Sequence, residues 1–185
     1  MTDAQILVLL ATRLRSRAPA AAIGVTFATL GGDPGVFPQL LAEAGRLEQV
    51  RIRGEQERWS LTAAGGAELA AHLGVETDRV GRADLVVAYE AFLPLNRAFL
   101  AALADGDSLA VLEDLVARLG PVLAALSSQL SRFDGYAKRF AVALGSAVAD
   151  PHWIASPSVD SVHTIWFELH EHLLATLGRT RADER

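Results

Sequence analysis

The spacing of apolar residues along the chain changes twice between residues 38 and 73. Apolar residues recur every three or four positions over 38–49, which predicts a helix with one buried face, and Pro38 suits its first turn. Over residues 50–53 and 58–61 apolar and polar side chains alternate instead, so we predict a β-hairpin with a polar tip at 54–57. Thr62 then precedes another helical stretch and is its predicted N-cap.

The residues before this segment predict two further helices. One covers residues 5–15, and a shorter one lies at 25–30 between breaker residues. The first 75 residues therefore predict the order helix, short helix, helix, hairpin and helix.

Two segments of this pattern are more specific than the rest, namely LLAEAGRL at 40–47 and RWSLTAAG at 58–65. On the basis of these two segments, residues 1–75 resemble the winged helix-turn-helix domains of MarR- and PadR-like bacterial transcriptional regulators. In that family the first segment ends the recognition helix, and the second leaves the wing through a Leu-Thr-x-x-Gly turn. The resemblance implies a dimer on duplex DNA, with the recognition helix in the major groove and the wing beside the backbone.

Five side chains of this domain are candidate DNA contacts: Gln39, Arg46, Arg51, Arg53 and Arg58. The arginines are suited to phosphates, and Gln39 is suited to a base edge. However, residues 32–39 contain no Arg or Lys, and residues 1–75 hold seven Arg against seven acidic residues. Because DNA-binding domains usually carry a basic excess, the alternative is a winged helix that contacts another protein without binding DNA.

The second half of the chain is predicted to be helical throughout. A polar interruption covers residues 74–84, and helices are predicted over 85–103, 109–130, 133–148 and 159–177. We expect a kink or break near Phe92, before Pro94, a bend at Gly120-Pro121, and Gly178 as the C′ residue of the last helix. The polar tail over 180–185 is expected to fray.

The predicted fold is therefore mostly α, with an N-terminal winged helix-turn-helix over residues 1–75 that includes a small β-hairpin. A C-terminal helical domain follows over residues 76–185. We predict that this second domain dimerises, senses a small-molecule effector, or does both.

The densest group of aromatic and polar residues lies between residues 152 and 172. A ligand pocket could be lined by Tyr136, Trp153, His163, Trp166 and His170. The alternative is that the histidines are buried and hydrogen-bonded in the core, and that Asp160 or Ser158 caps the last helix. Asn96, Arg97 and Arg139 are better explained as residues of solvated helix faces than as inward-pointing groups.

A metal site is disfavoured by the spacing of the histidines. His163 and His170 are seven residues apart, about 10 Å along a helix, so they cannot bind one ion. Asp160 with His163, or Glu168 with His172, could still supply a pair of ligands. We predict no metal, no cofactor and no enzymatic activity, because the sequence contains neither a Gly-x-Ser-x-Gly elbow nor a phosphate-binding loop.

Composition and charge narrow the class of protein. Hydrophobic residues make up 51% of the 185, enough for a sizeable core, and the lack of cysteine excludes disulfides and thiolate zinc sites. All of the net charge of −5 lies after residue 75, where 15 acidic residues face 10 basic ones. The N-terminus has no secretion signal, and no uninterrupted apolar run predicts a membrane span. We therefore predict a cytoplasmic, homodimeric transcriptional regulator whose partner is duplex DNA.

Overall fold

The computed structural model describes residues 2–54, 57–106 and 108–184, and the chain divides into two compact units. Unit 1 consists of Met1–Arg79 and Leu174–Arg185, and unit 2 consists of Val80–Leu173. The chain is mostly helical, as predicted, with one two-stranded antiparallel sheet in the described ranges. The predicted end of the first domain was residue 75, whereas unit 1 continues to Arg79 and also takes in the last segment of the chain.

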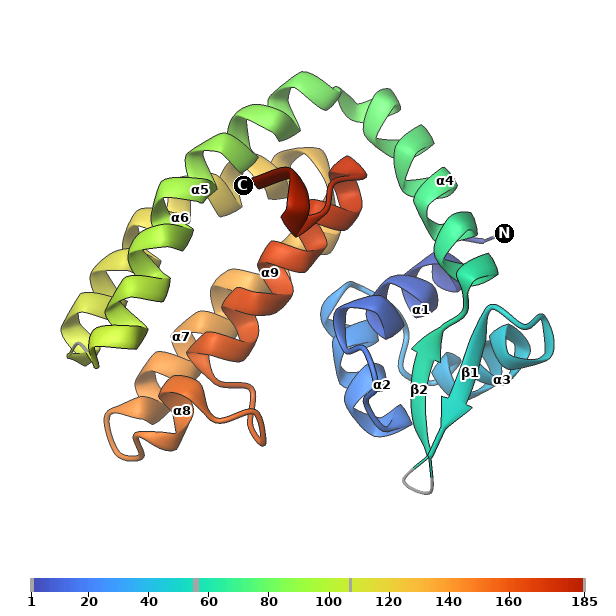
Figure 1. Ribbon diagram of the computed structural model, residues 1–185, viewed down its shortest axis with the longest axis horizontal. Coiled ribbons are helices and arrows are strands. Elements are labelled where there is room, and N and C mark those ends of the chain that lie inside the picture. Colours follow the sequence, from blue (N-terminus) through green and yellow to red (C-terminus); the bar gives the residue numbers. More distant parts are fainter. Residues whose placement is uncertain (1, 55–56, 107, 185) are drawn as a thin grey trace. The chain divides into compact units, whose positions relative to one another are not determined.

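Unit 1 follows the predicted order of elements. These are α1 (Asp3–Leu14), α2 (Ala20–Thr29), α3 (Phe37–Arg46), β1 (Val50–Arg53), β2 (Arg58–Leu61) and α4 (Ala63–Val80). Helices α1, α2 and α3 lie beside the hairpin (Figure 1). The predicted hairpin tip includes residues 55 and 56, which lie outside the described residues.

Helix α3 ends at Arg46, three residues earlier than predicted. Glu48 adopts a positive φ of 55°, and two backbone hydrogen bonds close the helix behind it. Glu48 N donates to Gly45 O at 3.1 Å, and Gln49 N donates to Ala44 O at 2.9 Å. This is a Schellman ending, which the apolar spacing of the segment does not reveal.

The interior of unit 1 is apolar. Its buried cluster joins α1, α2, α3, β1 and α4 through Val8, Leu9, Leu10, Ala11, Leu14, Ile23, Phe27, Leu30, Phe37, Leu41, Ala44, Val50, Leu69 and Leu73. The last turn of α9 adds Ala175 to this cluster. Beside it, buried Thr77 donates from Oγ1 to the carbonyl oxygen of Thr176 at 2.7 Å, so α4 is tied to the returning end of the chain.

The turn between β2 and α4 explains the Leu-Thr-x-x-Gly pattern physically. Thr62 Oγ1 accepts from Gly65 N at 3.0 Å, which confirms the predicted N-cap, and it also donates to Glu48 O at 2.6 Å. Gly65 lies against Gln49, the residue before β1, and a Cβ at Gly65 would collide with the backbone carbonyl of Gln49. The threonine therefore fixes the start of α4, and the glycine lets it approach the hairpin.

Unit 2 is a bundle of helices. Its elements are α5 (Arg82–Asp105), α6 (Leu109–Gln129), the 3-10 turn η1 (Ser131–Phe133), α7 (Gly135–Ala147), the short α8 (His152–Ala155) and α9 (Val162–Leu177). The last turn of α9, from Leu174 on, belongs to unit 1. Helix α8 was not predicted, and α9 begins at Val162 rather than at residue 159.

The predicted interruptions of the helices are only partly present. The break expected over 74–84 is confined to Gly81, with a φ of 109°, because α4 continues to Val80 and α5 begins at Arg82. The prediction was a kink or a break near Phe92; α5 is continuous through Phe92 and Pro94, so the helix does not break there. Gly178 has a φ of 65° and closes α9 as the predicted C′ residue, with Arg179 N donating to Leu174 O. The tail, expected to fray, forms the 3-10 turn Arg181–Glu184.

Helix α5 is unusually apolar. Among the described helices it is the one long and apolar enough to cross a membrane by length and composition, although core helices of soluble proteins pass the same test. Within its most apolar window, 44% is buried inside the structure. Much of this apolar helix therefore faces outward.

Candidate functional site

The outer face of α3 carries two of the predicted DNA contacts. Phe37, Leu41 and Ala44 point into the core, so the opposite side of the helix exposes Gln39, Ala42 and Arg46. These three positions share one face, because they are spaced by three and four residues. An amide, a methyl group and a guanidinium are side-chain groups that can contact base edges in a major groove.

The hairpin separates apolar from basic side chains. Arg51 pairs with Ser60, and Arg53 pairs with Arg58, so all three arginines lie on one face of the two strands. All three are exposed. The opposite face carries Val50, Ile52, Trp59 and Leu61, of which all but Ile52 are buried or half-buried.

The segment after α1 adds a backbone edge to the hairpin, which the sequence did not predict. Trp59 N donates to Ala18 O at 2.9 Å, and Arg17 N donates to Trp59 O at 3.0 Å. Arg58 Nη1 also donates to Arg17 O at 3.0 Å. These bonds hold exposed Arg17, with a φ of 61°, beside the strand that carries Arg58.

Together, Arg17, Arg51, Arg53 and Arg58 form what we call the wing cluster. Their guanidinium groups are suited to phosphate oxygens, which they can bind in a bidentate manner. Asp33, the acidic residue in the segment before α3, accepts a hydrogen bond from Gly35 N at 2.9 Å. It thus stabilises the turn that leads into the helix.

Unit 2 holds its polar groups inside. His172 is fully buried, stacks on Phe133 with ring centroids 4.0 Å apart, and bonds through both ring nitrogens. Arg132 Nε can only donate, so His172 Nε2 accepts at 2.9 Å and the proton of the neutral ring lies on Nδ1, 3.2 Å from the hydroxyl of Tyr136. Burial, followed by the charges of Arg132 and Arg139, lowers the pKa of His172 well below its ordinary value.

Arg139 joins two carboxylates in the same region. Its Nε and Nη2 donate to the two oxygens of Asp160 at 2.8 and 2.7 Å, and Nη2 also donates to Glu168 at 2.6 Å. Burial alone would lower the pKa of Arg139, but the hydrogen bond to Asp160 and the charges of Glu168 and Asp160 outweigh it, so the pKa is raised. The side chain is 9% exposed, so its predicted place on a solvated face is wrong.

Two other predictions about polar residues near Arg139 are also wrong. Asp160 binds Arg139 instead of capping α9, and Ser161 takes the cap position by accepting from Thr164 N at 3.2 Å. Asn96 is buried and accepts from Trp166 Nε1 at 3.0 Å, so it does not lie on a solvated face. Arg97 is exposed, as predicted.

The five residues of the predicted ligand pocket lie at different depths. Tyr136, Trp166 and His170 are buried, whereas Trp153 and His163 are half-buried. The rings of Trp166 and Phe99 stack at 4.0 Å, and His163 lies on the same phenylalanine at 6.4 Å. His170 packs against Phe92 at 5.2 Å, so the buried histidines have core partners, as the alternative interpretation expects.

Within the described residues there is no group of three or more His, Asp or Glu side chains that could hold a metal ion. No family model matches the chain, and no curated protein or solved structure is significantly similar to it.

Proposed function

We propose that the protein is a transcriptional regulator that binds duplex DNA through unit 1, as a dimer held together by unit 2. The observation that carries the proposal is the wing cluster, in which β-strand register places Arg51, Arg53 and Arg58 on one exposed face. Arg17 is held beside them by backbone bonds to Trp59.

The order of elements supports the same function. Three helices precede the hairpin, and Ala18, between α1 and α2, forms a backbone bridge to Trp59 that adds to the hairpin. The outer face of α3 exposes Gln39, Ala42 and Arg46. In a winged helix, the third helix enters the major groove and the wing lies along the backbone. The wing cluster would then supply affinity, and the face of α3 would supply base contacts.

The test is the salt dependence of binding to a labelled duplex from the gene's own promoter region, measured by fluorescence anisotropy on the full chain. We expect the Arg51→Glu/Arg53→Glu variant to bind at least about tenfold more weakly to every duplex. The slope of log affinity against log salt should also fall by about 2, because two phosphate contacts are removed.

The matched control is Lys138→Glu/Ala141→Glu/Val142→Glu, which changes the net charge by the same −4 on exposed residues of α7. It should leave the affinity and the salt slope unchanged. Equal losses in both variants, or no salt-sensitive binding by the unaltered chain at low ionic strength, would refute the proposal.

A second candidate function, protein contact through unit 1, is favoured by one observation. An apolar groove of about 380 Å³ lies between α2 and α3, lined by Ala20, Ala21, Gly24, Phe37, Pro38, Leu41, Ala42 and Trp59. Val25, on α2, is 55% exposed. With the wing cluster in the same unit, this groove suits a partner helix that carries both apolar and acidic residues.

This second function predicts that a purified partner loses affinity for an Ala42→Glu variant, while the unaltered chain shows no binding to duplex DNA. Ala42 also lies on the outer face of α3 that is proposed to contact DNA. The substitution therefore distinguishes the two functions only when DNA binding by the unaltered chain is measured as well.

A further inference from the structure

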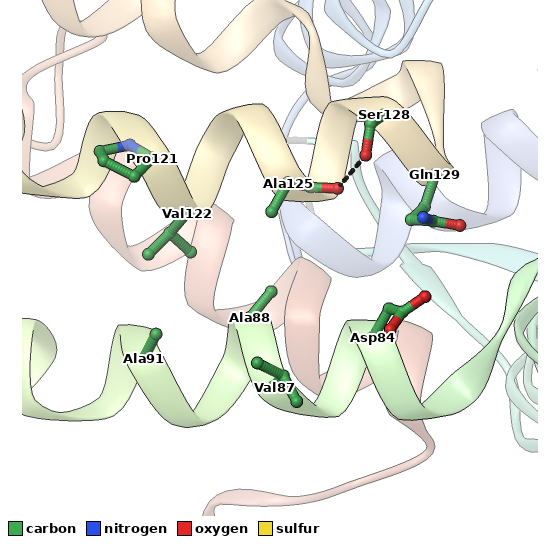
Figure 2. Close-up of a pocket in the computed structure, with 9 residues that line it drawn as sticks. All are labelled: Asp84, Val87, Ala88, Ala91, Pro121, Val122, Ala125, Ser128 and Gln129. Carbon is green, nitrogen blue, oxygen red and sulfur yellow. Dashed lines mark hydrogen bonds between the residues drawn. The ribbon is translucent and has the colours of Figure 1, made fainter.

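The outer side of the α5–α6 pair forms an apolar groove of about 390 Å³ in unit 2. Figure 2 shows Val87, Ala88 and Ala91 of α5 opposite Pro121, Val122 and Ala125 of α6, with Asp84 and Gln129 at one end. We call this surface, together with the exposed side of both helices, the α5–α6 face.

Along α5 this face is too apolar for a surface that remains in water, whereas the exposed side of α6 also carries the Arg118–Asp114 ion pair. Val87 is 65% exposed, and Ala91, Pro94 and Ala101 are exposed along the same side of α5. Between Leu85 and Ala104 the only charged residues are Glu90 and Arg97. The most apolar window of this helix would suit a membrane by composition, yet only 44% of it is buried inside the structure. Large exposed apolar patches mark interaction surfaces.

The dimensions of the face match what a stable dimer buries. A helix of 24 residues is about 36 Å long, and two packed helices together are about 20 Å wide. The face therefore offers about 700 Å² per copy, close to the about 800 Å² per partner of a standard interface.

Two charged residues in the middle of α5 are placed symmetrically for pairing with a second copy of the same helix. Glu90 and Arg97 are both exposed and lie at equal distances from the midpoint of Arg82–Asp105. They point to the same side of the helix, because seven residues are close to two full turns. In an antiparallel pairing about that midpoint, Glu90 of one copy meets Arg97 of the other, and this occurs twice.

From these observations we propose that the α5–α6 face is the dimer interface, formed by two copies packed as a four-helix bundle with antiparallel α5 helices. The inference rests on the proposed function for the expectation of a dimer, and it names the surface that forms it. Small side chains such as Ala91 and Ala125 let the helices approach closely, and the exposed side of Val87 becomes buried.

The first experiment measures the mass of the full chain by sedimentation velocity from about 1 to 100 μM, without DNA, over the range in which dimers of ordinary affinity form. The unaltered chain should sediment at twice its monomer mass, and Val87→Glu should sediment as a monomer. Val142→Glu is the matched control, because Val142 is 53% exposed on α7, and it should remain a dimer. Circular dichroism confirms that both variants are folded.

The second experiment tests the antiparallel pairing itself. Glu90→Arg and Arg97→Glu should each weaken the dimer by about 3- to 10-fold, because like charges then meet across the interface. The double variant Glu90→Arg/Arg97→Glu restores opposite charges at both contacts. It should recover most of the lost affinity, whereas two independent surface charges would give additive losses.

Several results would overturn the inference: a monomer throughout the concentration range, a dimer unaffected by Val87→Glu, or no recovery in the double variant. Binding to anionic phospholipid vesicles that is lost in Val87→Glu, without a dimer, would assign the face to membranes instead. A monomer that binds DNA refutes this inference and the dimeric part of the proposed function, but leaves DNA binding through unit 1 intact. A dimer that does not bind DNA refutes the proposed function alone.

Discussion

The two units place their charged side chains in opposite ways. In unit 1 the core is formed by apolar side chains from α1 to α4, while the arginines of the hairpin are exposed. In unit 2 Arg139, Glu168 and His172 lie inside the bundle, and the outer side of α5 is apolar. Charge on a surface remains available for a partner, whereas charge in an interior is already committed to its neighbours.

The difference has energetic consequences that can be measured. Exposed charges contribute little to folding because water and salt screen them. A buried ion pair adds little over an apolar pair, but removing one member leaves an uncompensated charge and costs much more. Substitution of the buried Arg139 should therefore affect folding, whereas substitution of an arginine of the wing cluster should affect binding.

The largest effect is expected at Arg139, which binds two carboxylates inside unit 2. Arg139→Met leaves Glu168, with a side chain 1% exposed, and Asp160 without their shared guanidinium. The free energy of unfolding, measured by urea denaturation at pH 7, should fall by about 3–5 kcal/mol. The control Arg118→Met removes the exposed pair with Asp114 and should cost less than about 1 kcal/mol. Similar losses in both variants would remove the distinction between buried and exposed charge.

Unit 1 should instead be sensitive to the packing of its backbone. Gly65→Ala places a methyl group against the carbonyl of Gln49 and should destabilise unit 1 by about 1–3 kcal/mol. At the neighbouring Gly66, no atom lies within 4 Å of the position that a Cβ would occupy, so Gly66→Ala should be neutral or stabilise α4 by up to about 1 kcal/mol. The comparison is made by thermal denaturation, and equal behaviour of the two variants would contradict the packing of this turn.

A smaller effect should appear in the pH dependence of stability. The pKa of His172 is depressed in the folded chain and about 6.5 when unfolded, so below that pH only the unfolded state binds the proton. Its effect on stability is absent above about pH 7, and stability should fall as the pH drops below about 6.5, with a slope of at most about 1.4 kcal/mol per pH unit from this one proton. His172→Gln, which still offers Arg132 an acceptor, should lose this part of the slope in urea titrations. An unchanged slope would mean that folding does not depress the pKa of His172.

Much of unit 1 was predictable because its elements follow local rules. The change of apolar spacing from helical to alternating identified α3 and the hairpin, and Thr62 marked the start of α4. The Schellman ending at Glu48 was missed, because the residue with positive φ is not a glycine. The bridge at Ala18 was missed as well, since a single backbone pairing has no periodicity.

The interior of unit 2 was harder to predict because its partners are distant in sequence. Arg139 and Asp160 are 21 residues apart, and Arg132 and His172 are 40 apart. An arginine within an amphipathic helix ordinarily faces water, so nothing local distinguishes Arg139 from Arg97. The surplus of acidic residues on nearby α9 was the one available signal that an inward arginine had carboxylates to bind.

The smallest effect on folding is expected at Arg53. A substitution there should separate a contribution to DNA binding from a contribution to stability most sharply. This residue faces Arg58 across the hairpin, and like charges in directly opposed positions repel. Arg53→Met should therefore leave the unfolding free energy within about 0.5 kcal/mol of the unaltered value, or raise it slightly. The same variant should bind duplex DNA several-fold more weakly at low salt, because one phosphate contact is lost. A loss of stability comparable to that of Arg139→Met, with unchanged DNA affinity, would mean that the wing cluster serves folding rather than binding.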